Sequence, residues 1–325
     1  MSEKTSGPGE RVYRSILVPL DGSEAAESVL ELARNLAVRS GAAVTLLHVC
    51  RPGETDRKQL HSAYIERAAE LMQRDIAKLC DTVACFFRGG EATAVPVLKV
   101  GEPAAEILSC AREIGASIIL MTTHGRTGTS ASLMSDITNR VMRTSPIPVW
   151  LIRTLNPNEI VCVDWPPKQV LLPLDGSDRA EKVMPYARAY AQLFGAEMVL
   201  LRVCDQPDIL ADYPEGSMSL SWDEHVGRVR DLSKKQCSLY LNEVAANLNK
   251  EGLKTRVETL LGSAAEEIIK YVGNNRCDLV AMTTFGRSRL ANWTTDSMLG
   301  RLFFSDVTER VLAASSRGIL LVRGD

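Results

Sequence analysis

The sequence predicts an α/β protein made of two doubly wound domains, each with a five-stranded parallel sheet. The first observation is an internal repeat, because residues 16–50 return as residues 170–204 without a gap and with about half of the positions identical. The second is the length of 325 residues, which suits two domains of ordinary size. The third is the alternation of continuous apolar runs with segments of helical spacing, which is typical of a parallel sheet covered on both faces.

The first half opens with a strand, a helix and a second strand. Ile16–Leu20 is an apolar run that ends in a turn at residues 21–23, and Ser23 is placed to cap the helix that follows. Helical spacing of apolar residues continues to Gly41, which is expected to end the helix. Val44–Val49 is predicted as the second strand, so this segment is a βαβ unit.

The rest of the first half continues the alternation. Helices are expected from Lys58 to about Leu79, near Pro103, and from Asp136. The apolar side of the first of these is predicted to carry Leu60, Ala63, Tyr64, Ala68, Leu71, Met72 and Ile76. Three further strands are predicted: Val95–Val100, Ser117–Met121 and Ile147–Ile152.

The second half repeats this plan. Its strands are predicted at Val170–Leu174, Met198–Val203, Thr255–Leu260, Asp278–Met282 and Gly318–Val322. We therefore expect four segments: a disordered lead-in of residues 1–13, a first domain of residues 14–155, a proline-containing linker of residues 156–169, and a second domain of residues 170–325.

Composition and charge limit the classes of partner. The 38 basic and 40 acidic side chains give a net charge of −2, so no nucleic-acid partner is expected. No apolar run approaches the ~20 residues that span a bilayer, so no membrane partner is expected either. The N-terminus lacks the apolar stretch of a signal peptide, and we expect a cytoplasmic protein.

The eight cysteines and four histidines form no clear metal or disulfide pattern. No CxxC pair occurs and most cysteines lie in apolar runs, so buried reduced thiols are expected. The histidines are scattered without the spacing of metal ligands, so no metal is expected; they are His48, His61, His124 and His225.

Doubly wound sheets bind ligands at the carboxyl ends of their strands, where the strand order reverses. Three segments of each half are expected to meet there: the turn after the first strand, the end of the second strand, and the loop after the fourth. In the first half these segments contain Asp21, Val49 and residues 122–136. In the second half they contain Asp175, Val203 and residues 283–306.

Four stretches of each half together resemble the universal stress protein family. They read ILVPLDGSE, LLHV, VGEPAAEIL and MTTHGRTG…SDITNRVMRTSPIPVWLIR in the first half. In the second half they read VLLPLDGSD, LLRV, LGSAAEEII and MTTFGRSR…SDVTERVLAASSRGILLVR. The resemblance covers nearly all of both halves in the same order. It implies a tandem member whose halves each have a Rossmann-like, adenine nucleotide alpha hydrolase-like fold.

The resemblance also implies roles for the site residues. In the family's nucleotide-binding members, an Asp after the first strand helps to hold the sugar, and a Val closing the second strand lines the adenine. These roles fall on Asp21 and Val49 in the first half. They fall on Asp175 and Val203 in the second.

The family's phosphate loop, of pattern G-x2-G-x9-G-[ST], is not conserved in this chain. Its glycines let the backbone approach the phosphates closely. The four positions are occupied by Thr122, Gly125, Ser135 and Asp136 in the first half. In the second half, where the loop is nine residues longer, they are Thr283, Gly286, Ser305 and Asp306. Only the two glycines match, and Arg126 and Arg287, which directly follow them, are candidates to attract a phosphate.

Asp136 and Asp306 stand where the family has a hydroxyl donor, and both are expected to cap the helices they begin. Two negative groups ~4 Å apart repel by ~4 kcal/mol at an effective dielectric constant near 20. We therefore expect no cofactor, or ATP or AMP held weakly.

The sequence thus favours a stress-response binding or regulatory protein, not an enzyme. One alternative is an ATP- or AMP-binding sensor with slow or no hydrolysis. Another is a binder of a different small ligand under the second-half loops near Tyr213, Trp222 or Trp293. The resemblance implies that the halves pack as an intramolecular pseudo-dimer, because dimers of the family commonly pair through the last strand, here Ile147–Ile152 against Gly318–Val322. Such pairing would also hide two strand edges. A homodimer of whole chains is a further option.

Overall fold

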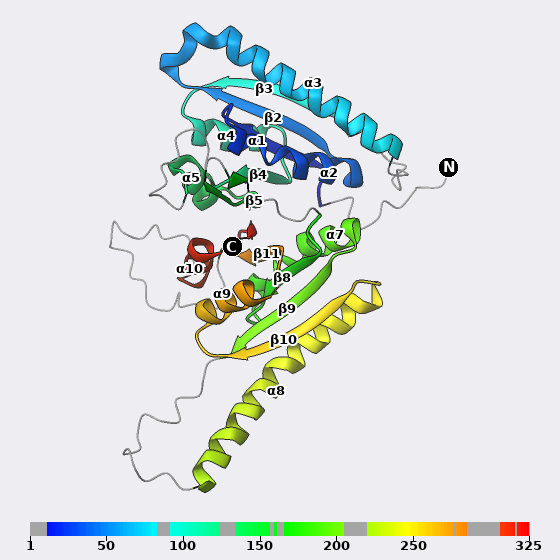
Figure 1. The fold of residues 1–325 in the computed structure, drawn as a ribbon, viewed down its shortest axis with the longest axis vertical. Coiled ribbons are helices and arrows are strands. Elements are labelled where there is room, and N and C mark those ends of the chain that lie inside the picture. The colour runs from blue at the N-terminus through cyan, green and yellow to red at the C-terminus, as the bar shows by residue number, and fades with distance from the viewer. Residues whose placement is uncertain are drawn as a thin grey trace.

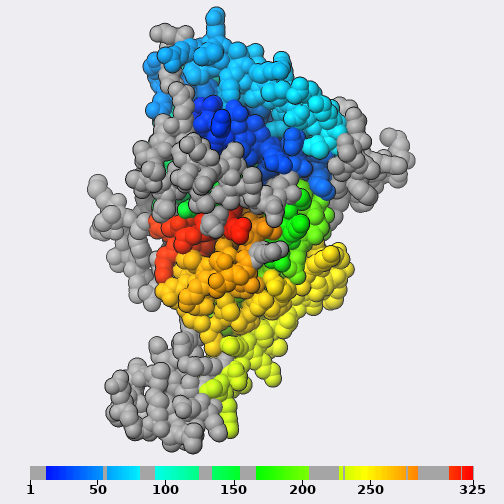
Figure 2. Space-filling model, in the orientation of Figure 1, coloured from blue at the N-terminus to red at the C-terminus, as the bar shows by residue number. Residues whose placement is uncertain are grey.

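The protein folds into two α/β halves that share one sheet (Figure 1). The computed structural model describes residues 12–82, 92–123, 134–156, 159–160, 166–204, 220–275, 277–284, 306–315 and 317–324. In Figure 2 the first half, in blue to cyan at the top of the view, lies above the second half, in light green to red. The segment predicted as a disordered lead-in falls almost entirely outside these residues.

The first half supplies five strands of the main sheet, each within two residues of its predicted bounds. They are β1 (Ser15–Leu20), β2 (Ala43–Cys50), β3 (Ala94–Val100), β4 (Ile118–Thr122) and β5 (Val149–Ile152). The helices are α1 (Glu24–Glu27), α2 (Leu30–Ser40), the 3-10 helix η1 (Pro52–Arg57), α3 (Lys58–Thr82), α4 (Pro103–Glu113) and α5 (Asp136–Thr144).

The second half repeats this set of elements. Its strands are β8 (Gln169–Pro173), β9 (Glu197–Cys204), β10 (Thr255–Leu261), β11 (Leu279–Thr283) and β12 (Gly318–Val322). Its helices are α6 (Asp178–Glu181), α7 (Met184–Phe194), α8 (Leu220–Lys250), α9 (Ala264–Asn274) and α10 (Asp306–Ala314). Between the halves, β6 (Thr154–Asn156) and β7 (Glu159–Ile160) form a small antiparallel sheet.

Local chemistry accounts for the start of each half. The Ser23 Oγ accepts the backbone N–H of Ala26 at 3.1 Å, so Ser23 caps α1 as predicted. The single helix expected after it is instead divided into α1 and α2, with Val29 at the junction. Gly41 ends α2 with a φ of 69°, a left-handed conformation that glycine adopts without a Cβ clash.

The strand order shows where a ligand site belongs. The sheet runs β10-β9-β8-β11-β12-β5-β4-β1-β2-β3, so each half has the doubly wound order 3-2-1-4-5. The order reverses between β1 and β4, which pair through Ile16↔Ile118, and between β8 and β11, which pair through Val170↔Leu279. The carboxyl ends of these strands are therefore the expected binding edges.

Two hydrophobic layers cover the two faces of the sheet, and each layer is continuous through both halves. Alternate residues of one strand enter different layers: Ile16 and Val18 pack on the side of α2, α3, α7 and α8, whereas Leu17 packs on the side of α4, α5, α9 and α10. This double burial explains why the strands appear in the sequence as unbroken apolar runs. Within the described residues, no helix is long and apolar enough to cross a membrane.

The halves join through the two strands expected to pair, β5 and β12. They run antiparallel, with Ile319↔Leu151, Leu320↔Trp150 and Leu321↔Val149 as partners. Side chains reinforce the junction: the Tyr13 hydroxyl donates to the carbonyl of Tyr186 at 2.8 Å. The pairing hides one edge of each half-sheet, which removes two exposed edges from the molecule.

One feature of α3 differs from the prediction. Leu60 and Ala63 were both expected on the apolar side, but both are exposed, Leu60 by 67%, and His61 is half-buried instead. Tyr64, one turn further along, faces the core as expected, and its hydroxyl donates to Glu27 of α1 at 2.8 Å. The buried face of α3 therefore begins with a histidine, which matters for the site below.

Candidate functional site

A cavity of about 190 Å³ lies at the carboxyl ends of β1, β2 and β4 in the first half. Four of the residues predicted from the sequence line it: Asp21, Val49, Thr122 and Ser135. The structure thus brings together the three first-half segments that strand order predicts should meet. The apolar part of the lining includes Pro19, Leu20, Leu47, Pro103, Ile107, Met121 and Ile137.

Asp21 and Asp175 form the same turn in both halves. The Asp21 Oδ1 accepts the backbone N–H of Ser23 at 3.0 Å and its hydroxyl at 2.6 Å. The Asp175 Oδ1 accepts the corresponding groups of Ser177 at 2.9 Å and 2.6 Å. One oxygen of each carboxylate is therefore used to hold the turn after the first strand.

Threonine hydroxyls fix the next edge of the site. The Thr138 Oγ1 donates to the carbonyl of Thr122 at 3.1 Å, which ties the first turn of α5 to the end of β4. The Thr308 Oγ1 donates to the carbonyl of Thr283 at 3.0 Å in the second half. Both halves therefore place the start of a helix against the end of their fourth strand.

The cap of α5 is Ser135, and the expectation that Asp136 caps this helix is wrong. Ser135 has the extended backbone of an N-cap residue, and its Oγ accepts the backbone N–H of Thr138 at 3.1 Å. Asp136 is the first helical residue, and it is exposed. Its charge still lies in the first turn, where the helix dipole favours a carboxylate. In the second half, α10 starts at Asp306, whose side chain lies outside the description.

We expect Ser135→Ala to lower the free energy of unfolding by about 1 kcal/mol, since it removes the cap. Asp136→Asn should change it by less than ~0.5 kcal/mol, since it removes only an exposed charge from the first turn. Urea unfolding of the two variants checks this ranking. A larger loss of unfolding free energy in Asp136→Asn than in Ser135→Ala would mean that Asp136, and not Ser135, caps α5.

Several predicted residues lie outside the described part of the chain. The glycines Gly125 and Gly286, the arginines Arg126 and Arg287, and Ser305 belong to this group. So do Tyr213, Trp293 and the side chain of Trp222, which the alternative small-ligand site requires. Val203 is partly buried and packs against the layer formed by α9 and α10.

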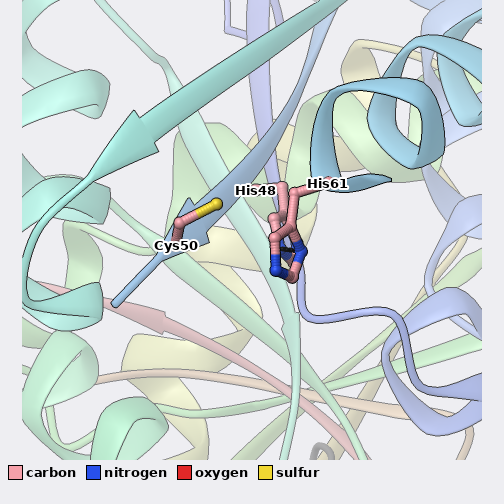
Figure 3. Close-up of side chains that lie close together, drawn as sticks. All are labelled: His48, Cys50 and His61. Carbon is pink, nitrogen blue, oxygen red and sulfur yellow. Dashed lines mark hydrogen bonds between the residues drawn. The ribbon is translucent and has the colours of Figure 1, made fainter. Parts of the chain in front are cut away.

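The polar lining of the cavity also includes His48, Arg51 and His61, which were not predicted as site residues from the sequence. The His48 Nε2 lies 2.8 Å from the His61 Nδ1, and the Cys50 Sγ belongs to the same cluster (Figure 3). The histidines were expected to be scattered, and that is wrong for this pair. Helical spacing contained the signal, because His61 precedes the core-facing, partly buried Tyr64 by one turn.

The second half has different chemistry at the matching positions. Arg202 replaces His48, and its guanidinium lies 5.3 Å from the ring centre of Tyr240 and close to Gly176. Cys204 at the end of β9 forms a disulfide with Cys237 of α8. The expectation of reduced cysteines is therefore wrong for this pair, because α8 crosses the end of β9 and brings the two sulfurs together. Among the other described cysteines, Cys110 and Cys277 are buried free thiols.

Comparison with known proteins gives a consistent result. The sequence model of the Universal stress protein family matches residues 12–153 and again residues 167–323. A universal stress protein of Methanocaldococcus jannaschii is 27% identical over 156 residues, which cover 48% of this chain and 82% of that protein. One from Bacillus subtilis is 25% identical over 148 residues, covering 44% of this chain and all of that protein.

Solved structures agree at the level of the fold. A universal stress protein from Archaeoglobus fulgidus superimposes with a TM-score of 0.63 at 18% identity, over 96% of this chain and 98% of that one. A functionally unknown protein from Pseudomonas aeruginosa gives 0.66 at 13% identity, over 98% and 95%. These likenesses extend over both halves, so the arrangement of two such units in one chain also occurs elsewhere.

Proposed function

This chain belongs to the universal stress protein family, and from that membership we propose that it is a tandem stress-response protein that binds and regulates, without turnover. Its halves, residues 14–155 and 170–325, act as two domains of an intramolecular pseudo-dimer. The ligand site is the first-half cavity, and that cavity holds ATP weakly or not at all. The observation that carries this proposal is a small cavity lined by Ser135 and Thr138 at the start of α5, where the neighbouring Asp136 adds an exposed negative charge.

The charge of Asp136 supports weak phosphate binding. A phosphate at the N-terminus of α5 would lie near this carboxylate, because Asp136 is the first residue of that helix. Two such charges ~4 Å apart repel by ~1 kcal/mol in water and by ~4 kcal/mol at an effective dielectric constant near 20. Asp136 is exposed, so we place the penalty nearer the lower value, which is about fivefold in affinity.

The volume of the cavity also supports weak binding of ATP. Pockets for drug-sized ligands usually enclose ~300–1,000 Å³, whereas this cavity encloses about 190 Å³. It suits a base or a ligand of similar size better than a complete nucleoside triphosphate. In the second half, Arg202 lies where His48 stands in the first, so the two halves have diverged and the first is the better candidate.

We expect ATP with Mg²⁺ to shift the melting temperature of the full chain by less than one degree at millimolar concentration. Asp136→Asn should strengthen ATP binding about fivefold, because it removes the repelling charge. The matched control is Asp178→Asn, which removes an exposed carboxylate from the first turn of α6, away from the α5 N-terminus. Thermal shift and calorimetric titration both report the change.

An ATP- or AMP-binding sensor is the second candidate, favoured by Asp21, Val49 and Arg51 in the cavity wall. Asp21 lies at the position of the sugar contact, and Arg51 supplies a cation at the cavity wall. A wild-type shift of several degrees with ATP or AMP would replace the leading proposal by this one. Release of inorganic phosphate in the same samples would show slow hydrolysis.

A further inference from the structure

Two imidazoles and one thiol meet where the end of β2 faces the start of α3 (Figure 3). The three side chains are His48, Cys50 and His61, and their ligand atoms all lie within 4.8 Å of one another. His48 and Cys50 are buried, and His61 is half-buried. His48 and His61 also line the cavity of the first half.

The hydrogen bonds of the cluster fix where the protons lie. The carbonyl of Leu20 can only accept, and it lies 2.8 Å from the His48 Nδ1, so that nitrogen carries the proton. In the neutral ring the His48 Nε2 is then unprotonated and carries a lone pair, and the His61 Nδ1–H donates to it, with 2.8 Å between the two nitrogens. The His61 Nε2 is left as a second lone pair, buried and without a hydrogen-bond partner among the described residues.

His48 has the environment of a metal ligand. Metal-binding histidines almost always donate their second ring N–H to a carbonyl or carboxylate, which fixes the tautomer and directs the other nitrogen to the metal. The bond to Leu20 does this for His48. Tyr64 packs edge-on to the His48 ring, with 5.6 Å between ring centres, and so restricts its rotation.

We propose that His48, His61 and Cys50 bind one divalent cation of the zinc class. Two imidazoles and a thiolate are ligands that zinc prefers, and a three-residue set leaves a fourth position for a small molecule from the cavity. The cation lies between the His48 Nε2 and the His61 Nδ1, and the His61 proton moves from Nδ1 to Nε2, so that both rings bind as neutral imidazoles. The Cys50 thiol releases its proton to solvent on binding. Two nitrogens on a tetrahedral zinc lie about 3.3 Å apart, so the rings need to separate by only about 0.5 Å.

The second half supports the assignment by contrast. Cys204 corresponds to Cys50, since each ends the second strand of its half. Cys237 corresponds to His61, since each lies three residues before a tyrosine. That tyrosine, Tyr240 or Tyr64, donates to a glutamate in the first short helix of its half, α6 or α1. That pair forms a disulfide, and Arg202 brings a positive charge to the position of His48. One metal site for each chain is therefore expected, not two.

The test uses the full chain, stripped with a chelator and titrated with zinc alone against a chromophoric competitor. We expect one equivalent of zinc to bind, and His61→Gln to weaken binding at least tenfold. Titration with cobalt should give a thiolate-to-cobalt charge-transfer band that Cys50→Ser abolishes. His61→Gln and Cys50→Ser change different elements, so a folding defect in one leaves the other informative; circular dichroism identifies such a defect.

Two matched controls remove equivalent groups elsewhere. Cys110→Ser removes a different buried thiol of the first half, and His225→Gln removes a histidine of α8. Both should retain one equivalent with unchanged affinity. No stoichiometric binding by the wild-type chain, or equal affinity in wild type, His61→Gln and Cys50→Ser, would refute the site. Because no nucleotide is present, this result is independent of the ATP titration above.

Discussion

Replacement of Trp150 by alanine is expected to lower the free energy of unfolding by about 4 kcal/mol. Trp150 lies on β5 at the junction of the halves, is only 2% exposed, and pairs with Leu320 of β12. Its ring packs edge-on against Tyr190 of α7, with 5.3 Å between ring centres. The truncation therefore opens a cavity between the halves and removes an aromatic contact that joins them.

Urea unfolding followed by circular dichroism measures this loss. Leu60→Ala is the control, because Leu60 is a large apolar residue that is mostly exposed, and its removal should cost less than ~0.5 kcal/mol. The double variant Trp150→Ala/Tyr190→Ala should be less destabilised than the sum of the singles, since the two rings share one contact. A loss of under ~1 kcal/mol in Trp150→Ala would mean that the junction is not packed as described.

The fold could be predicted because the signals for it are long and redundant. Each strand is buried on both faces, so an apolar run identifies it without any need for an exact phase. The repeat then supports every element of one half with its counterpart in the other. The pairing of β5 with β12 followed from the family resemblance and from the edges that five-stranded sheets leave exposed.

The candidate site was harder to predict, because a shift of one residue along a helix is enough to make a prediction about a side chain wrong. Successive residues of a helix are about 100° apart, so the exchange of Leu60 for His61 on the buried face of α3 changes an apolar contact into a polar wall. The cap of α5 differs in the same way, by the step from Asp136 to Ser135. Strand and helix contacts such as Cys204 with Cys237 depend on where a helix crosses a strand, which local patterns do not encode.

Stability is expected to fall steeply above pH 10, because two tyrosines at the junction are buried as neutral phenols. Tyr13 is fully buried, and its hydroxyl donates to the carbonyl of Tyr186; Tyr190 is also buried, and its hydroxyl donates to the carbonyl of Pro167 at 3.2 Å. Burial raises the pKa of the Tyr13 and Tyr190 hydroxyls well above the ordinary value of about 10. The folded chain therefore keeps both protons where the unfolded chain has lost them.

The sign of the effect follows from this difference in bound protons. The contribution of each tyrosine is complete below pH ~10, and above it stability falls by up to ~1.4 kcal/mol for each pH unit, or ~2.7 kcal/mol for the pair. Urea unfolding at several pH values from 8 to 11.5 measures the slope. Tyr190→Phe should lower the free energy of unfolding at pH 8 by about 1 kcal/mol. It should also reduce the alkaline slope of stability by up to ~1.4 kcal/mol per pH unit, and the double variant Tyr13→Phe/Tyr190→Phe should reduce this slope by up to twice as much. Lysines and the remaining tyrosines titrate alike in all variants, so the difference between the slopes isolates these two hydroxyls. An unchanged slope in the double variant would show that the two hydroxyls ionise in the folded state.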